Sequence, residues 1–208
     1  MASPKPARSP MREEVAALKR QRTLDTATDL FYEKGFTNTT LDDVAQRMGV
    51  TKPFIYTNFG SKPDLLVAIC EIGVRSALEE IERVLEQGPP TRDTLRRFMP
   101  GYVAAVLRTQ KNIAINIREE KNLLPEHADQ LATLRQTFMT RIERLLRDAG
   151  GQSDRSAADL RVTAFAIVGA VSWATFWFNP NGPLSPQELA DKMTDIILNL
   201  VQGTSATA

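Results

Sequence analysis

Residues 40–62, TLDDVAQRMGVTKPFIYTNFGSK, decide the fold of this chain because they contain three helix starts and one tight turn within a short span. Thr40 and Asp43 have the spacing of a capping box, in which each side chain accepts a backbone N–H from the other residue. A helix is therefore predicted from Leu41. Gly49 ends it, since glycine adopts the left-handed conformation that a helix C-terminus commonly requires.

Two more helix starts follow the turn. Thr51 is predicted to cap a second short helix, and Pro53 lies in its first turn, where a missing N–H costs little. Phe59 ends this helix. Ser61 and Asp64 repeat the capping-box spacing, so a third helix is predicted to begin at once. Two short helices around a tight turn form the pattern of a helix-turn-helix.

The exposed side of the second short helix indicates what it could bind. It offers hydroxyls, an ammonium group, an amide and flat apolar surface, which suit phosphate oxygens and base edges in a DNA major groove. These groups belong to Thr51, Lys52, Pro53, Tyr56, Thr57 and Asn58. The favoured interpretation is a DNA-binding surface. The alternative is a helical hairpin with a polar, solvated face.

A family resemblance favours the first interpretation. The sequence LFYEKGFTNTT, followed directly by LDDVAQRMGVTKPFIYTNFGSKPDLL, covers residues 30–66. It resembles the DNA-binding domain of TetR-family transcriptional regulators, and the likeness extends over residues 20–72. The resemblance implies that Pro53 is the small residue at the start of the recognition helix, Tyr56 its nearly fixed aromatic residue and Lys62 a phosphate-binding lysine. The expected partner is a double-stranded DNA operator.

Further candidate DNA contacts lie outside the recognition helix. Arg20 and Arg22, near the start of the first helix, are expected to contact the DNA backbone, and Thr40 is included among the expected contacts. Residues 1–62 carry ten Lys or Arg and seven Asp or Glu, whereas the remainder carries sixteen against eighteen. The net charge of +1 for the whole chain therefore hides a positive charge on the helix-turn-helix.

Composition bounds the class of protein. A chain of 208 residues with 42% hydrophobic content can bury a packed core in one or two domains. No apolar run approaches the ~20 residues of a membrane span, and the N-terminus lacks the apolar block of a signal peptide. We therefore expect a soluble, cytoplasmic protein with no membrane partner.

The predicted fold is all-α, because no stretch shows sustained strand alternation. Residues 1–16 are interpreted as a disordered basic arm, which is either a solvated tail or a segment that follows a DNA minor groove. Residues 17–77 are predicted to form the DNA-binding domain, with its helix-turn-helix at 40–59, and residues 78–208 a helical regulatory and dimerisation domain. The first predicted helix ends at Lys34. After the helix-turn-helix, the predicted helices cover residues 62–87, 94–111, 112–120, 126–149, 155–178 and 186–202.

The segment AFAIVGAVSWATFWF, residues 164–178, is apolar around its whole circumference and so requires cover on every side. Small residues would allow a partner helix to approach, and the last helix adds an apolar stripe. In TetR regulators the last two helices form a four-helix dimer interface, which the resemblance implies here. The expected interface residues are Ala166, Gly169, Ala170, Leu189, Met193, Ile197 and Leu200. The alternative is a central helix in a larger monomeric core.

The sequence gives no support for an enzymatic function. The chain has one cysteine, Cys70, and one histidine, His127, and it has neither a Gly-rich phosphate loop nor a nucleophile elbow. Neither residue has neighbours at metal-ligand spacing, so both are expected to be structural. We therefore expect no catalysis, no metal and no cofactor. The remaining alternative is an architectural DNA-binding protein without a ligand.

The resemblance also implies a small-molecule pocket in the second half of the chain. Aromatic side chains and one cation are the candidates for its lining: Phe98, Tyr102, Arg118, Phe138, Phe165, Trp173 and Trp177. The segments REEKNLLPEH (118–127) and WFNPNGPLSPQELAD (177–191) resemble TetR regulators that sense acyl-CoA thioesters. A planar drug-like molecule, as for efflux-pump regulators, is the alternative. The expected function is a homodimeric repressor that a small lipophilic effector releases from DNA.

Overall fold

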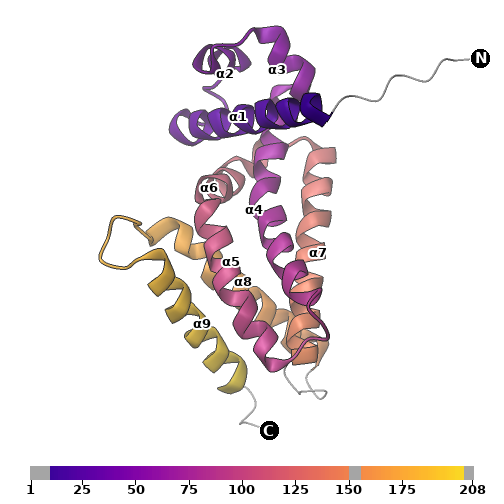
Figure 1. Cartoon of the computed structure of the whole chain (residues 1–208), viewed down its shortest axis with the longest axis vertical. Coiled ribbons are helices and arrows are strands. Elements are labelled where there is room, and N and C mark those ends of the chain that lie inside the picture. Colours follow the sequence, from indigo (N-terminus) through magenta and orange to yellow (C-terminus); the bar gives the residue numbers. More distant parts are fainter. Residues whose placement is uncertain (1–9, 150–155, 204–208) are drawn as a thin grey trace, which may run out of the picture.

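A computed structural model describes residues 10–149 and 156–203, and these residues form helices and no strand. The elements are α1 (Pro10–Lys34), α2 (Leu41–Met48), α3 (Lys52–Phe59), α4 (Lys62–Leu85), α5 (Arg92–Arg108), α6 (Gln110–Glu119), the 3-10 helix η1 (Glu120–Asn122), α7 (Pro125–Ala149), α8 (Ala157–Trp177) and α9 (Pro186–Gly203). The all-α prediction is confirmed. In Figure 1, α1, α2 and α3 form one end of the molecule, and the remaining helices form a longer bundle below them.

The first turn of α2 forms as its sequence predicts. The Thr40 hydroxyl accepts the N–H of Asp43, and the Asp43 carboxylate accepts the N–H of Thr40 at 2.7 Å. Gly49 then ends α2 with a φ of 68°, in the left-handed region. These local interactions determine both ends of an eight-residue helix. The direction of the turn that follows is therefore determined locally as well.

The other two predicted caps differ from the structure. Thr51 occupies the N-cap of α3, but its side chain makes no cap hydrogen bond. The cause is local: Pro53 has no N–H to donate, and the N–H of Phe54 bonds to the Thr51 carbonyl instead. At α4 the Ser61 hydroxyl accepts the N–H of Asp64, but the Ser61 N–H donates to the Phe59 carbonyl at 2.8 Å and not to the Asp64 carboxylate, so a complete capping box is absent there.

The predicted basic arm is too long. Residues 10–16 belong to α1, which begins at Pro10, a residue type that suits the first position of a helix. Helix-favouring residues such as Glu13, Glu14 and Ala16 follow it, so the helix extends further back than its apolar stripe. Residues 1–9 lie outside the described part of the chain.

The helix α4 belongs to two hydrophobic cores. Leu66 and Ile69 in its first half pack in the core of the helix-turn-helix, whereas Ile81 in its second half packs in the core of the bundle. Ile115 of α6 and Leu131 of α7 also enter the first core. The predicted domain boundary after residue 77 therefore falls inside a continuous helix, and the two cores share elements.

The bundle is built around α4 and α5. The helix α4 packs against α5, α6 and α7, while α5 also contacts α9 and α8 packs against α5, α6 and α7. By length and composition alone, α8 is long and apolar enough to cross a membrane, although no such run was expected from the sequence. A helix of a soluble protein can pass the same test when its apolar surface is covered. One side of α8 is buried in this way, and the other side is exposed.

Candidate nucleic-acid interface

The packing of α3 determines which of its side chains are available for binding. Ile55 and Phe59, one turn apart, are buried in the core of the helix-turn-helix. The opposite face is exposed, and 46% of the Tyr56 surface is accessible. Thr51, Lys52, Pro53 and Thr57 are exposed with it, whereas Asn58 is half-buried. Five of the six residues predicted on this helix therefore form one accessible surface.

Hydrogen bonds reduce what some of these side chains can offer. The Thr57 hydroxyl donates to the Pro53 carbonyl at 2.8 Å, and the Asn58 amide donates to the Phe54 carbonyl at 2.7 Å. The Thr51 hydroxyl, in contrast, takes no part in capping α3. Thr51 is thus better placed than Asn58 to bond a phosphate or a base edge.

Lys52 is held between two neighbours. Its Nζ lies 2.8 Å from the Asp42 Oδ2 and 5.9 Å from the centre of the Tyr56 ring. The hydrogen bond and the charge of Asp42 raise the pKa of Lys52, so its ammonium group remains charged. Asp42 was not predicted as part of this surface, because the contact joins residues ten positions apart across the turn.

Lys62, the predicted phosphate-binding lysine, is the first residue of α4. Its Nζ lies 4.3 Å from the centre of the Phe36 ring and 3.4 Å from the Thr37 carbonyl oxygen. Burial lowers the pKa of Lys62, while Glu119 and Asp43 act in the opposite direction. A cation at a helix N-terminus is opposed by the helix dipole, but the same N-terminus attracts anions. Lys62 and the N-terminus of α4 can therefore bind the same phosphate group.

Arg20, Arg22 and Thr40 occupy different environments. Arg20 donates to the Asn58 carbonyl at 3.1 Å and lies 4.4 Å from the Phe59 ring centre, so it ties α1 to the end of α3. The Thr40 hydroxyl bonds Asp43 within the capping box. Arg22 is exposed on α1. Of these three, Arg22 is the most available for a DNA backbone contact.

A groove between α1 and α3 adds residues that the sequence reasoning missed. It has a volume of about 450 Å³ and includes Lys19, whose Nζ lies 5.8 Å from the Phe54 ring centre. Val15 and Ala16 line the α1 side, and Thr57 is among the residues on the α3 side. The basic run KRQR at residues 19–22 is the signal that could have indicated Lys19.

Arg118, predicted in the ligand pocket, lies elsewhere. Its guanidinium group donates to the carbonyls of Phe31 and Tyr32, at the end of α1, and its Nε lies 2.9 Å from the Glu119 Oε1. Glu119 in turn accepts the N–H of Phe36 at 3.3 Å. Carbonyls at a helix C-terminus lack partners within the helix, and an arginine satisfies them well. Arg118 therefore joins α6 to the end of α1, beside the helix-turn-helix.

Three of the predicted pocket residues form one buried cluster. The Phe98 and Tyr102 rings are stacked with centres 5.2 Å apart, and the Phe138 ring centre lies 5.4 Å from that of Tyr102. Burial raises the pKa of Tyr102, and a hydrogen bond to Ser172 acts in the opposite direction. The cluster connects α5, α7 and α8.

The other three aromatic candidates lie on the outer side of α8, away from this cluster. Exposed fractions are 53% for Phe165, 64% for Trp173 and 53% for Trp177. The prediction of one pocket lined by all seven residues is therefore wrong in its placement of these three and of Arg118. Helical periodicity could not separate inner from outer positions because α8 is apolar on every side.

An apolar face follows α8 and part of α9. It contains Val162, Phe165, Trp173, Phe176, Trp177, Ile196 and Leu200, which are all exposed. Ala166, Gly169 and Ala170 are exposed on α8 as well, and a Cβ added at Gly169 would meet nothing within 4 Å. Leu189 and Ile197 are instead buried within the subunit, and Met193 is half-buried. The predicted interface is therefore corrected on α9: Leu189 and Ile197 lie inside the subunit, whereas Ile196 and the predicted residue Leu200 are exposed.

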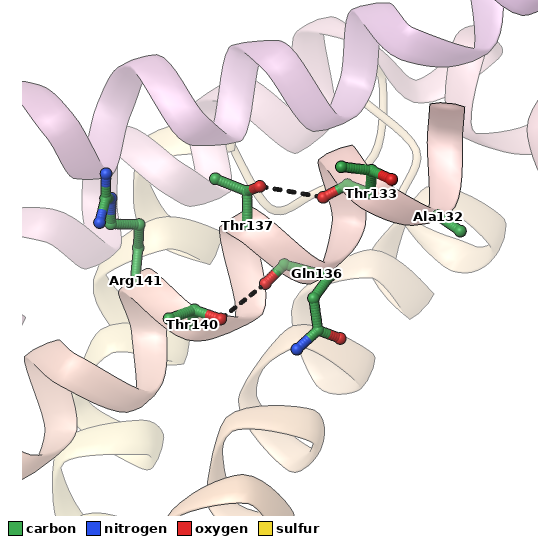
Figure 2. A pocket seen from close by; sticks show the side chains of 6 residues that line it. All are labelled: Ala132, Thr133, Gln136, Thr137, Thr140 and Arg141. Carbon is green, nitrogen blue, oxygen red and sulfur yellow. Dashed lines mark hydrogen bonds between the residues drawn. The ribbon is translucent and has the colours of Figure 1, made fainter. Parts of the chain in front are cut away.

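A second surface feature is an open groove on α7. It has a volume of about 500 Å³ and is lined by Ala132, Thr133, Gln136, Thr137, Thr140 and Arg141 (Figure 2). The hydroxyls of Thr137 and Thr140 donate to carbonyls one turn earlier in the helix. The hydroxyl protons are therefore used within α7, and Arg141 supplies the positive charge of the groove.

Cys70 and His127 are both buried in the described structure. Burial raises the pKa of the Cys70 thiol to about 12, so the thiol remains protonated and unreactive at neutral pH. The His127 Nε2 lies 3.1 Å from the Asp64 Oδ1 and joins α7 to the start of α4. Among the described residues, no three His, Cys, Asp or Glu side chains lie close enough together to hold a metal ion.

Two family models match the chain. The family described as bacterial regulatory proteins, tetR family, matches residues 24–69, and the tetracyclin repressor-like C-terminal domain matches residues 88–201. The transcriptional repressor KstR2 of Rhodococcus jostii (strain RHA1) is a curated relative, 25% identical over an alignment of 187 positions that covers 87% of this chain and 90% of KstR2. The matches together cover both the helix-turn-helix and the bundle.

Solved structures resemble the whole arrangement. The TetR-family transcriptional regulator PfmR from Thermus thermophilus is 29% identical with a TM-score of 0.75, covering 86% of this chain and 97% of PfmR. The regulator AibR, solved in complex with isovaleryl coenzyme A and operator DNA, is 27% identical with a TM-score of 0.71, covering 85% of this chain and 96% of AibR. The bundle and the helix-turn-helix thus occur together in these proteins as they do here.

Proposed function

Since this chain belongs to the TetR family, whose members are helix-turn-helix DNA-binding transcriptional regulators and not enzymes, we propose that it is a cytoplasmic, homodimeric repressor. The dimer binds a palindromic double-stranded operator through two copies of α3. An acyl-CoA thioester bound in the C-terminal bundle releases it from DNA. Each of these steps is supported by a different part of the molecule.

The observation that carries the proposal is the exposed apolar face of α8 and α9. Aromatic side chains such as Trp173 and Phe176 bury large areas on association, and a group of exposed apolar residues along one side of a helix favours an interaction site. Small residues beside them, including Gly169, allow a helix of a second copy to approach closely. A symmetric dimer presents two recognition helices, which read a palindrome when they lie about one DNA turn, ~34–36 Å, apart.

The proposed effector rests on both likeness and chemistry. AibR, which has the same fold at 27% identity, was solved with isovaleryl coenzyme A, so a related effector class is the natural candidate for this chain. The acyl group requires an apolar site, and the Phe98, Tyr102 and Phe138 cluster is the candidate wall. The phosphates require cations, and Arg141 at the α7 groove is one candidate.

Coupling between effector and DNA requires an element that both sites affect. The helix α4 is that element in our proposal, because its two halves pack in the two cores. The helix α6 adds a second connection. Asn112 donates to the Thr28 hydroxyl and the Ile69 carbonyl, both at 3.3 Å, while Lys111 pairs with Asp29 at 2.6 Å. A shift of α4 or α6 would therefore move α1 and the recognition helix.

The proposal is tested with the purified protein and genomic DNA of its source. Fragments that the protein retains are sequenced to identify an operator, and the complex is then titrated with acyl-CoAs of increasing chain length. We expect at least one acyl-CoA to raise the melting temperature and to weaken operator binding by about 5- to 150-fold, the usual range of allosteric coupling. Planar aromatic compounds form the comparison series.

Two variants locate the effector. Phe138→Trp enlarges a buried residue of the aromatic cluster and should abolish the acyl-CoA response, with its melting curve checked for folding. Ile117→Trp enlarges an exposed apolar residue on α6, outside both the aromatic cluster and the α8–α9 face, and should keep the response. A response to planar aromatics alone would assign the effector to the other class. Stabilisation by a ligand without any change in operator affinity would favour an architectural DNA-binding protein.

A further inference from the structure

One cation of the candidate DNA surface differs from the others. Of Arg20, Arg22, Lys52 and Lys62, only Lys52 forms an ion pair with a carboxylate among the residues that the structure describes. Its partner is Asp42, at 2.8 Å. Lys62 instead contacts an aromatic ring and a backbone carbonyl, which leave its charge available to an anion.

The ion pair joins the starts of two helices. Asp42 is the second residue of α2, and Lys52 is the first residue of α3. A carboxylate is favourable at the N-terminus of a helix, whereas an ammonium group is unfavourable there. Asp42 therefore stabilises the Lys52 charge at a position where the dipole of α3 opposes it. Both side chains are more than half exposed, so a phosphate group can reach them.

A DNA phosphate competes with Asp42 for the same ammonium group. The dipole of α3 favours an anion at the start of the helix, and Lys52 would add a charge-assisted hydrogen bond to a phosphate. The Lys52 ammonium group has three N–H donors, so it either leaves Asp42 or donates to the carboxylate and the phosphate together. In both cases the Asp42 carboxylate remains close to the bound phosphate and repels it. Asp42 thus opposes the contact both before and after it forms.

We propose that Asp42 is a determinant of DNA affinity, which holds Lys52 in an ion pair and thereby weakens binding to DNA of any sequence. The inference rests on the proposed role of Lys52 as a DNA contact. Sequence-independent affinity comes almost entirely from pairing of cations with phosphates. Lower affinity for bulk DNA leaves more protein free to find its operator among the many competing sites of a genome.

The test uses the full-length protein and a fluorescently labelled duplex of random sequence, so no operator is needed. Dissociation constants are measured by anisotropy over a series of salt concentrations. Asp42→Asn should bind about three- to tenfold more tightly than the wild type, because the ion pair leaves Lys52 only a partial contact with phosphate in the wild type. The logarithmic salt slope should be steeper by up to roughly 0.9, the value for one full phosphate contact. An unchanged affinity and slope would overturn the proposal.

A matched control separates a local effect from a change in net charge. Asp25→Asn removes one negative charge from α1, where Asp25 is exposed and accepts a hydrogen bond from Gln21. We expect Asp25→Asn to change affinity much less than Asp42→Asn. Equal effects of the two variants would assign the gain to net charge and refute the ion-pair explanation. Asp42→Ser is the second variant if melting curves show that Asp42→Asn is poorly folded.

Variants of Lys52 distinguish failure of this inference from failure of the proposed function. Lys52→Gln should weaken binding and reduce the slope, and Asp42→Asn should then add little in the Lys52→Gln background. If Lys52→Gln weakens binding but Asp42→Asn behaves like the control, Asp42 has no such role and the DNA surface stands. If Lys52→Gln has no effect, Lys52 is not a DNA contact and this inference is refuted with it.

Discussion

The exposed surface of α3 and the exposed face of α8 and α9 differ in how they arise. On α3, the buried pair Ile55 and Phe59 leaves a polar side with Lys52 and Thr51 exposed. On α8, apolar residues occupy every side, so the helix sequence alone does not distinguish the exposed Trp173 from the buried Val171. An amphipathic helix reveals its binding face through its pattern, whereas a uniformly apolar helix reveals only that it must be covered.

The two neighbours Ile196 and Ile197 provide the sharpest test of this comparison on α9, because one is 66% exposed and the other 2%. Ile197→Asp places an unpaired charge in the core of the bundle, which costs several kcal/mol, on the order of the whole stability of a domain. We expect the variant to be unfolded or aggregated. Circular dichroism melting measures this, and a native melting curve would show that α9 is packed differently.

Ile196→Asp changes the same residue type on the outer side. It should keep the helical content and the cooperative melting of the subunit, and shift the protein from dimer to monomer in sedimentation experiments. Operator binding should fall because the two recognition helices are no longer linked. Gly169→Asp tests the α8 part of the same face. A folded protein that remains dimeric with either charge would place the interface elsewhere.

Lys62→Gln tests the polar surface at the other end of the molecule. Because Lys62 is a proposed phosphate contact, its loss should weaken binding to all DNA sequences and lower the salt slope by roughly one unit. The control is Lys34→Gln, which removes an exposed cation from the last turn of α1. A salt slope that is the same in both variants would exclude Lys62 from phosphate binding.

Thr40 and Thr51 form the pair with the smallest expected effects. Thr40→Val removes a capping hydroxyl and should lower the free energy of unfolding by ~1 kcal/mol, whereas Thr51→Val should change it little because that hydroxyl caps nothing. Urea unfolding measures both. Thr51→Val should instead alter the bases that the protein prefers in a selected pool of operators. A base preference identical to the wild type would move sequence readout away from Thr51.

Much of the helix-turn-helix could be predicted because its signals are local. The capping box of Thr40 and Asp43 and the left-handed Gly49 act within a few residues, and both occur in the structure as expected. The other two expected capping interactions are incomplete because a neighbour competes for a hydrogen bond. Pro53 deprives Thr51 of one donor, and the Phe59 carbonyl takes the Ser61 N–H that the Asp64 carboxylate would accept in a full capping box. These are competitions between single hydrogen bonds, which a spacing rule does not resolve.

The sequence by itself determined that the chain is helical, where the helices after α1 begin and end within a few residues, and which side of α3 faces outward. Only the tertiary structure decided that Arg118 lies at the end of α1, that Asp42 pairs with Lys52, and that Phe165 is exposed while Phe138 is buried. The physical reason is the range of the forces involved. Helix boundaries depend on hydrogen bonds between residues three or four positions apart, whereas burial and ion pairing depend on which helices pack together.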